Sequence, residues 1–101
     1  MEDINSLKKF WNKKRVFITG HTGFKGTWLC IILKYLNTKV NGYSLKPEKN
    51  SLFNKSQIGK KLDSNTYSDI NDIIKLKKKI KQTKPEIIFH FAAQPLVLES
   101  Y

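Results

Sequence analysis

Three evenly spaced glycines follow a short apolar run near the start of this chain. The run is Arg15–Thr19, the glycines are Gly20, Gly23 and Gly26, and a helical apolar pattern begins immediately afterwards. This order predicts a buried strand, a tight turn, and a helix whose first N–H groups are free to face a pyrophosphate. Such a strand–turn–helix unit restricts the chain to the α/β class and makes the turn a candidate dinucleotide site.

The spacing Gly-x-x-Gly-x-x-Gly is typical of Rossmann domains of the short-chain dehydrogenase type. We expect Gly20 to permit the sharp exit from the strand, Gly23 to let the backbone approach a phosphate, and Gly26 to let the helix pack against the sheet. The backbone N–H groups of Phe24 and Lys25 would then face the pyrophosphate, with the Lys25 charge beside them. The alternative is an ordinary turn that happens to use glycine.

The rest of the 101-residue chain continues the alternation of strands and helices. The expected helices span 24–36 and 69–82, and the expected further strands span 39–44, 66–67 and 86–91. Residues 1–14 read as a polar leader with a short helix, and residues 45–65 as a long connection with one short turn. This order predicts a Rossmann-type three-layer α/β sandwich with a partial parallel sheet of about four strands in the order 3-2-1-4.

Apolar spacing predicts which side of each helix is buried. The expected buried stripes are Leu7, Phe10 and Trp11 in the leader, Trp28, Leu29, Ile32, Leu33 and Leu36 in the first main helix, and Ile70, Ile73, Ile74 and Ile80 in the second. Cys30 is expected to face the core as a small apolar residue.

Two further segments are candidates for contacts with a dinucleotide. Asp69 precedes a helix, so spacing favours it as the N-cap, and its carboxylate together with the Ile70 backbone could also contact an adenine. Ala92, Ala93 and Gln94 follow the last strand at the carboxyl edge of the sheet, where small side chains leave room for a ribose. The alternative for this second segment is a strand that merely ends in small residues.

No catalytic residue or metal ligand set is assigned. Tyr35 and Lys39 match the Tyr-x-x-x-Lys spacing of short-chain dehydrogenases, but a helix ends at the first and a strand begins at the second, so they would not share a helical face. His90 is expected to be a hydrogen-bonded core residue. The single cysteine, Cys30, with only two histidines cannot form a zinc site.

The chain is strongly basic, with 19 Lys and Arg against 8 Asp and Glu and a net charge of +11. The lysines are not interleaved with aromatic residues, so we expect solvated faces rather than a nucleic-acid surface, although a basic interaction protein remains an alternative. The polar, acidic start is unlike a signal peptide, and no apolar stretch approaches membrane-spanning length. We therefore expect a cytoplasmic protein without a membrane partner.

Residues 14–28 (KRVFITGHTGFKGTW) and 88–97 (IFHFAAQPLV) resemble the N-terminal part of the CDP-glucose 4,6-dehydratase family. That family belongs to the extended short-chain dehydrogenases, with the nucleotide-sugar epimerases and dehydratases. Phe10-Trp11, residues 42–45 (GYSL) and residues 51–53 (SLF) also fit, so the resemblance covers nearly the whole chain.

The resemblance implies an enzyme with tightly held NAD that takes a hydride from C4 of glucose, loses water across C5 and C6, and returns the hydride at C6. It also implies roles for the candidate residues. Pyrophosphate would be held by Gly20, Gly23, Phe24, Lys25 and Gly26, adenine by Asp69 and Ile70, and the ribose and nicotinamide side by Ala92, Ala93 and Gln94. Lys46 stands where many members carry an acidic residue, so NADP remains open as the cofactor.

By the same resemblance, residues 1–101 are expected to be the N-terminal part of an NAD(P)-binding Rossmann domain that is inactive alone. The catalytic Tyr-x-x-x-Lys and the sugar-nucleotide part would follow Tyr101. The full-length protein is expected to act on a nucleotide sugar as a homo-oligomer. Alternatives are part of another nucleotide-sugar epimerase or dehydratase, or a stand-alone dinucleotide-binding module.

Overall fold

In the part of the chain that the structure describes, four parallel strands form one sheet in the order β3-β2-β1-β4. The strands are β1 (Arg15–Thr19), β2 (Lys39–Ser44), β3 (Ser64–Tyr67) and β4 (Ile87–His90). This computed structural model describes residues 2–92. The observed pairing confirms the predicted parallel α/β fold and its strand order.

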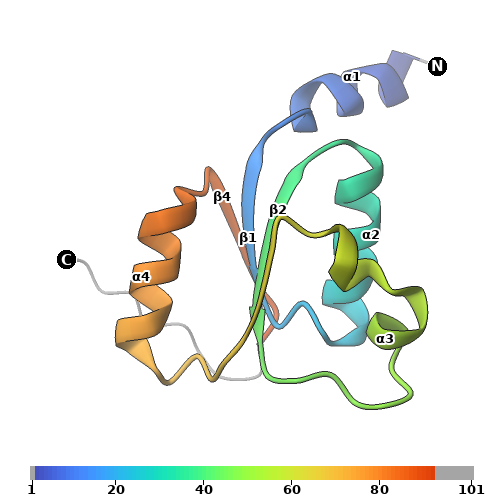
Figure 1. Ribbon diagram of the computed structural model, residues 1–101. Coiled ribbons are helices and arrows are strands. Elements are labelled where there is room, and N and C mark those ends of the chain that lie inside the picture. The colour runs from blue at the N-terminus through green and yellow to red at the C-terminus, as the bar shows by residue number, and fades with distance from the viewer. Residues whose placement is uncertain (1, 93–101) are drawn as a thin grey trace.

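Helices cover both faces of the sheet, as Figure 1 shows. The helix α2 (Phe24–Tyr35), the short helix α3 (Leu52–Ser56) and the 3-10 helix η1 (Ile58–Lys61) cover one face. The helix α4 (Ile73–Thr83) covers the other, and α1 (Glu2–Trp11) lies near the amino end of β1. All four strands run toward the same edge, so the turn after β1 and the segments after the other strands meet there.

The central strand β1 is buried on both faces because its side chains alternate between two cores. Val16 and Ile18 pack with Cys30 from α2, whereas Phe17 packs on the opposite side with Leu76 from α4. Val16, Phe17 and Ile18 are at most 1% exposed. A run of three consecutive apolar residues is therefore explained by helices on both sides of a parallel sheet.

The face of α2 that packs on the sheet differs from the predicted stripe. Trp28 and Ile32 are 46% and 51% exposed, whereas the buried side contains Thr27, Cys30 and Leu33. Gly26, Thr27 and Cys30 have small side chains and let the helix lie close to the sheet, whereas Trp28 and Ile32 face away from it. The prediction is wrong at Trp28 and Ile32 and correct for Leu33, Leu36 and Cys30.

The helix α4 begins at Ile73, four residues later than predicted. Its N-cap is Asp72, whose carboxylate accepts a hydrogen bond from Lys75 N at 3.2 Å. Asp69 instead accepts a bond from Asn71 N at 2.8 Å and shapes the turn before the helix. The prediction of Asp69 as the N-cap is therefore wrong, because two suitable aspartates lie three residues apart and the second is placed to cap.

The later start of α4 also changes its buried face. Leu76 is fully buried, whereas Ile73 and Ile74 are 38% and 84% exposed, so the predicted places of Ile73 and Ile74 in the buried stripe are wrong. In α1, Trp11 packs against the core, but Leu7 and Phe10 are 50% and 54% exposed. The leader thus contributes one anchoring aromatic residue rather than a whole apolar side.

The connection predicted over 45–65 contains more structure than a single turn. It includes α3 and η1, and Phe53 and Ile58 from these helices enter the core beside α2. The strand β3 begins at Ser64, two residues earlier than predicted. Among residues 2–92, no helix is long and apolar enough to cross a membrane.

Candidate functional site

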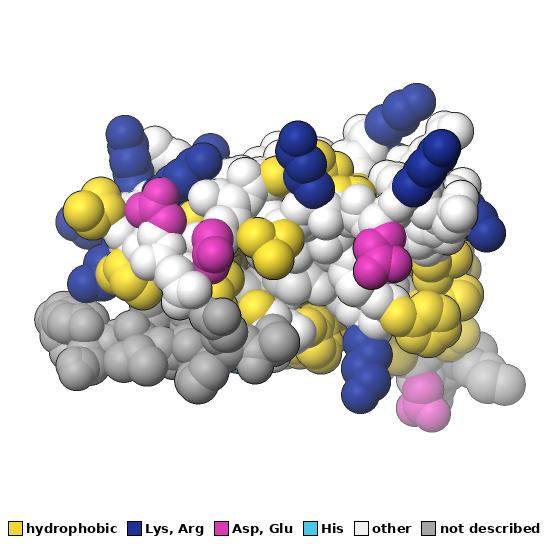
Figure 2. Space-filling model, turned by 90° about the horizontal axis from the view of Figure 1, so that it is seen from below, with side chains coloured by type: hydrophobic (Ala, Val, Ile, Leu, Met, Phe, Trp, Pro, Cys, Tyr) yellow, Lys and Arg dark blue, Asp and Glu magenta, His cyan; other side chains and the backbone are white. Residues whose placement is uncertain are grey.

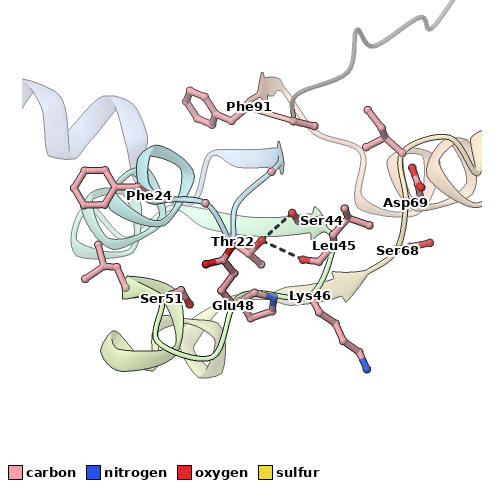
Figure 3. A pocket seen from close by; sticks show the side chains of 16 residues that line it. Thr22, Phe24, Ser44, Leu45, Lys46, Glu48, Ser51, Ser68, Asp69 and Phe91 are labelled. Carbon is pink, nitrogen blue, oxygen red and sulfur yellow. Dashed lines mark hydrogen bonds between the residues drawn. The ribbon is translucent and has the colours of Figure 1, made fainter.

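A cleft of about 780 Å³ opens at the carboxyl ends of the strands (Figure 3). It is lined by the glycine turn after β1 and by the segments that follow β2, β3 and β4. Its volume lies within the range of about 300–1,000 Å³ typical of small-molecule sites. In open parallel sheets, ligands bind beyond the carboxyl ends of the strands, which makes this cleft the candidate site.

Gly20 is required by both conformation and space. Its φ of +78° lies in the left-handed region, and a Cβ at this position would come within 2.6 Å of Ala92 N and of the Phe91 carbonyl carbon. Gly20 N also donates a hydrogen bond to Tyr43 O at 3.0 Å, which joins the turn to the end of β2. The turn can leave β1 sharply, as predicted, only because this residue has no side chain.

Gly26 brings the start of α2 against the turn. A Cβ here would overlap Gly20 O and lie 2.7 Å from His21 Cα. The Thr27 hydroxyl donates a hydrogen bond to His21 O at 3.0 Å and so also joins the start of α2 to the turn. The close helix packing predicted from the glycine spacing is therefore present.

Gly23 differs from the other two glycines because nothing in the described protein requires it. Its φ of −76° and ψ of 174° are ordinary extended values, and a Cβ would meet only Gly20 O at 3.6 Å. It lines the cleft, so the open space beside it is the space of the site itself. Because Gly23 has no side chain, a ligand group in the cleft can come close to the backbone at this point.

The N-terminus of α2 suits an anion. Gly23 is its N-cap, no side chain caps the helix, and no acidic residue lies in its first turn. The first N–H groups, those of Phe24 and Lys25 among them, have no partner within the helix and carry its partial positive charge. Phe24 lines the cleft, whereas the exposed side chain of Lys25 is not part of the lining. The residues present thus fit a pyrophosphate group.

A chain of hydroxyl groups fixes the floor of the cleft. Thr22 Oγ1 lies 2.9 Å from Ser44 Oγ and donates to Leu45 O at 3.1 Å, so Ser44 is left as the donor to Thr22 (Figure 3). These bonds tie the glycine turn to the end of β2. Thr22 and Ser44 are not among the predicted site residues, although the position of Thr22 inside the turn and that of Ser44 at a strand end were signals for them.

The other candidate residues are distributed around the same cleft. Asp69, Ile70 and Ala92 all line it. Asp69 Oδ1 is bound to Asn71 N, and Ile70 is 8% exposed and packs into the core beside α4. The predicted positions 93 and 94 (Ala93 and Gln94) lie outside the described residues.

His21 follows the first glycine and is completely buried. Its Nε2 lies 2.6 Å from Asn65 Oδ1 and donates to it, because an amide oxygen only accepts. The imidazole lies over Gly42, where a Cβ would overlap the ring, and meets Phe53 edge-on at 5.2 Å. Burial lowers the pKa of His21 below 6.5, and the polar groups of Asn65 and of the Tyr43 backbone only partly oppose this shift.

Within the described residues, the positions of His90, Cys30 and the Tyr35 and Lys39 pair fit structural roles. His90 Nδ1 lies 2.5 Å from Thr19 Oγ1, as expected for a hydrogen-bonded histidine. Burial raises the pKa of the Cys30 thiol to about 12, so this cysteine is not a nucleophile at neutral pH. Tyr35 ends α2 and Lys39 begins β2, so this Tyr-x-x-x-Lys pair does not share a helix.

Comparisons with known proteins agree with this geometry. The NAD dependent epimerase/dehydratase family matches residues 16–101. The CDP-glucose 4,6-dehydratase of Salmonella typhimurium is 50% identical over 95 residues, which are 93% of this chain but only 26% of that protein. The crystal structure of a candidate epimerase from Burkholderia cenocepacia J2315 superposes with a TM-score of 0.65 at 21% identity, over 83% of this chain and 26% of the other, and shares the fold. The chain belongs to the NAD dependent epimerase/dehydratase family.

Proposed function

We propose that this chain forms the dinucleotide-binding part of a CDP-glucose 4,6-dehydratase, and that its cleft holds the cofactor. The observation that carries the proposal is the uncapped N-terminus of α2 beside Gly23, a glycine that the described protein does not itself need. The choice of CDP-glucose rests on the similarity to the Salmonella typhimurium enzyme over 93% of the chain.

Each segment around the cleft has a proposed role. The pyrophosphate binds at the turn, with Gly20 and Gly26 shaping it, Gly23 leaving room, and the N–H groups of Phe24 and Lys25 donating. Adenine lies beside Asp69 and Ile70, and Ala92, Ala93 and Gln94 border the ribose and nicotinamide side. The hydrogen bond between Thr22 and Ser44 holds the glycine turn beside the end of β2, so both segments border the ligand.

The bound nicotinamide would supply a hydride acceptor for the sugar, which is the cofactor's own chemistry. The described residues bind and orient it, and in residues 2–92 the Tyr35 and Lys39 pair is not placed to move a proton on a sugar. The chain spans about a quarter of the length of the dehydratase that it matches. We therefore assign the acid–base chemistry and the nucleotide-sugar site to the part of such an enzyme that these residues do not include.

Calorimetric titration of NAD into wild-type protein and Gly23→Val tests the site. The backbone dihedral angles of Gly23 are ordinary for Val, and a Cβ there would meet only Gly20 O at 3.6 Å, so the fold should persist. The branched side chain should block the approach of the pyrophosphate. Losing two or more charge-assisted hydrogen bonds should cost about 3 kcal/mol or more, roughly a hundredfold in Kd.

Tyr35→Val is the matched control, because it places the same side chain at the far end of α2, where Tyr35 is 72% exposed. This variant should bind NAD as tightly as the wild type does. Equal affinity in wild type and Gly23→Val would remove the dinucleotide site from this turn.

The family resemblance also extends the proposal to a cytoplasmic, homo-oligomeric full-length enzyme. Its substrate would be a nucleotide sugar. Light scattering of the full-length protein measures the oligomeric state, and a monomer at micromolar concentration would contradict this part of the proposal.

A further inference from the structure

The outer side of α2 carries an exposed apolar stripe, which consists of Phe24, Trp28, Ile32 and Tyr35. Each of these side chains is between 46% and 72% exposed. Their spacing of three and four residues places them on one side of the helix, opposite the fully buried Cys30. The rings of Phe24 and Trp28 meet edge-on with their centroids 6.5 Å apart, so the stripe is a continuous surface and not a set of scattered residues.

The dinucleotide cleft does not account for this stripe. Of its four members, only Phe24 lines the cleft, and its ring extends away from the middle of the cleft (Figure 3). Figure 2 views the edge at which the strands end, and it shows hydrophobic side chains gathered at the end of this face that lies on the side of α2 and α3. A bound cofactor would therefore leave the stripe exposed.

The layers of the fold do not account for it either. A domain of this class has a sheet between two layers of helices, so a further strand extends the sheet sideways and a further helix lies beside α2. Neither would lie on top of α2. The outward side of such a helix faces water and is usually polar, and a contiguous apolar patch there marks an interaction site.

The stripe is complementary to a second copy of itself in an antiparallel arrangement. Trp28 and Ile32 stand two residues before and two residues after position 30, so a two-fold axis beside that position sets each Trp28 opposite the Ile32 of the other copy. The same axis separates the two copies of Lys25 by about 15 Å along the helix, because the rise is about 1.5 Å per residue. This separation exceeds the Debye length of about 8 Å, whereas a parallel arrangement would bring the two lysines together.

The exposed area is sufficient for such an interface. Burial of one aromatic side chain removes about 150–250 Å² from water, and the stripe contains three aromatic residues and one isoleucine, each about half exposed or more. Two copies would together bury on the order of 1,000 Å², which is about the minimum for a specific interface. Lys34, the other lysine of α2, is already paired with Asp63 at 3.0 Å, so its charge is compensated within one copy.

We propose that the outer side of α2 is an interface between two copies of this protein, packed antiparallel about a two-fold axis beside position 30. Burial of Trp28 against Ile32 of the other copy stabilises the contact, and the symmetry makes this contact occur twice. The inference specifies one contact of the proposed homo-oligomer. It does not depend on the dinucleotide site.

Sedimentation velocity of the full-length protein tests the interface in wild type, Ile32→Glu and Trp28→Lys. Each substitution should halve the mass of the assembly at micromolar concentration. The dissociation constant should rise about a hundredfold or more, because each variant would bury an unpaired charge at two symmetry-related places. Ile74→Glu is the matched control, since it makes the same change at an exposed isoleucine of α4, and it should keep the wild-type mass. Far-UV circular dichroism checks that all variants are folded.

An equimolar mixture of Ile32→Glu and Trp28→Lys tests the antiparallel packing. In a mixed pair, the introduced carboxylate would face the introduced ammonium group, and one wild-type contact between Trp28 and Ile32 would remain. The mixture should therefore recover the wild-type mass, although neither variant does so alone. An unchanged mass in both single variants, a mixture that does not reassociate, or a monomeric wild type would overturn the proposal. Binding of that monomer to vesicles of anionic lipid, abolished by Ile32→Glu, would assign the stripe to a membrane instead.

Discussion

Acid should destabilise this fold through His21. The side chain is completely buried, and burial lowers its pKa below 6.5. The residues that surround the imidazole (Asn65, Gly42, Phe53 and the Tyr43 backbone) carry no charge that could offset an imidazolium. The native state therefore holds His21 neutral, while the unfolded chain protonates it at its ordinary pKa.

The sign and size of the effect follow from proton linkage. Above pH 6.5 the histidine is neutral in both states and contributes no pH dependence. Below it, the unfolded chain binds a proton that the native state does not, so stability falls as the pH falls, by at most about 1.4 kcal/mol per pH unit. At pH 5.5 the loss can therefore reach at most about 1.4 kcal/mol, compared with the roughly 5–15 kcal/mol of total stability typical of a folded domain.

Urea unfolding of wild type and His21→Gln at pH 7.5 and pH 5.5 measures this loss. The carboxylates titrate in both proteins. At each pH, the difference between the free energy of unfolding of the wild type and that of His21→Gln therefore reports the contribution of His21. We expect the free energy of unfolding of the wild type, relative to that of the variant, to be lower at pH 5.5 than at pH 7.5, by no more than about 1.4 kcal/mol. His90→Gln, which removes the other histidine, should keep the acid-dependent loss. If the difference in free energy of unfolding between wild type and His21→Gln is the same at both pH values, the argument from the buried His21 is refuted.

Two further predictions concern the turn. Gly26→Ala should lower the free energy of unfolding by about 1–3 kcal/mol, because the added Cβ would lie 2.7 Å from His21 Cα, whereas Gly23→Ala should cost less than about 1 kcal/mol. Thermal unfolding checks both variants, and equal costs would contradict the packing argument. Lys25→Ala should weaken NAD binding by less than about tenfold, because the N–H groups remain and the Lys25 side chain is outside the cleft. A calorimetric loss as large as that of Gly23→Val would show that the lysine charge carries the binding.

Much of the site was predictable because it depends on local chemistry. The positive φ of Gly20 and the tight approach at Gly26 belong to one strand–turn–helix segment, and their spacing is visible in the sequence. The position of Ala92 at the same edge followed from the parallel order of the strands. The roles of these residues toward a dinucleotide stay predictions.

The polar residues around the cleft were not predictable in the same way. Thr22 meets Ser44 only because β2 lies beside β1. Glu48 lines the cleft from the loop after β2, where its carbonyl accepts bonds from Ser51 N and Asn54 Nδ2. The contact between Thr22 and Ser44 has no spacing signature, since the crossover connection through α2 brings the two segments together.

The sequence by itself determined the alternation of strands and helices, the parallel order of the sheet and the sharp turn after β1, because periodicity and glycine act over a few residues. The tertiary structure alone decided which side chains are buried. Leu76 rather than Ile74 packs under the sheet, and His21 is enclosed by residues from β2, β3 and α3. Burial depends on how segments that are distant in the sequence pack against one another. A small rotation of a helix about its axis is enough to turn a different set of side chains toward the core.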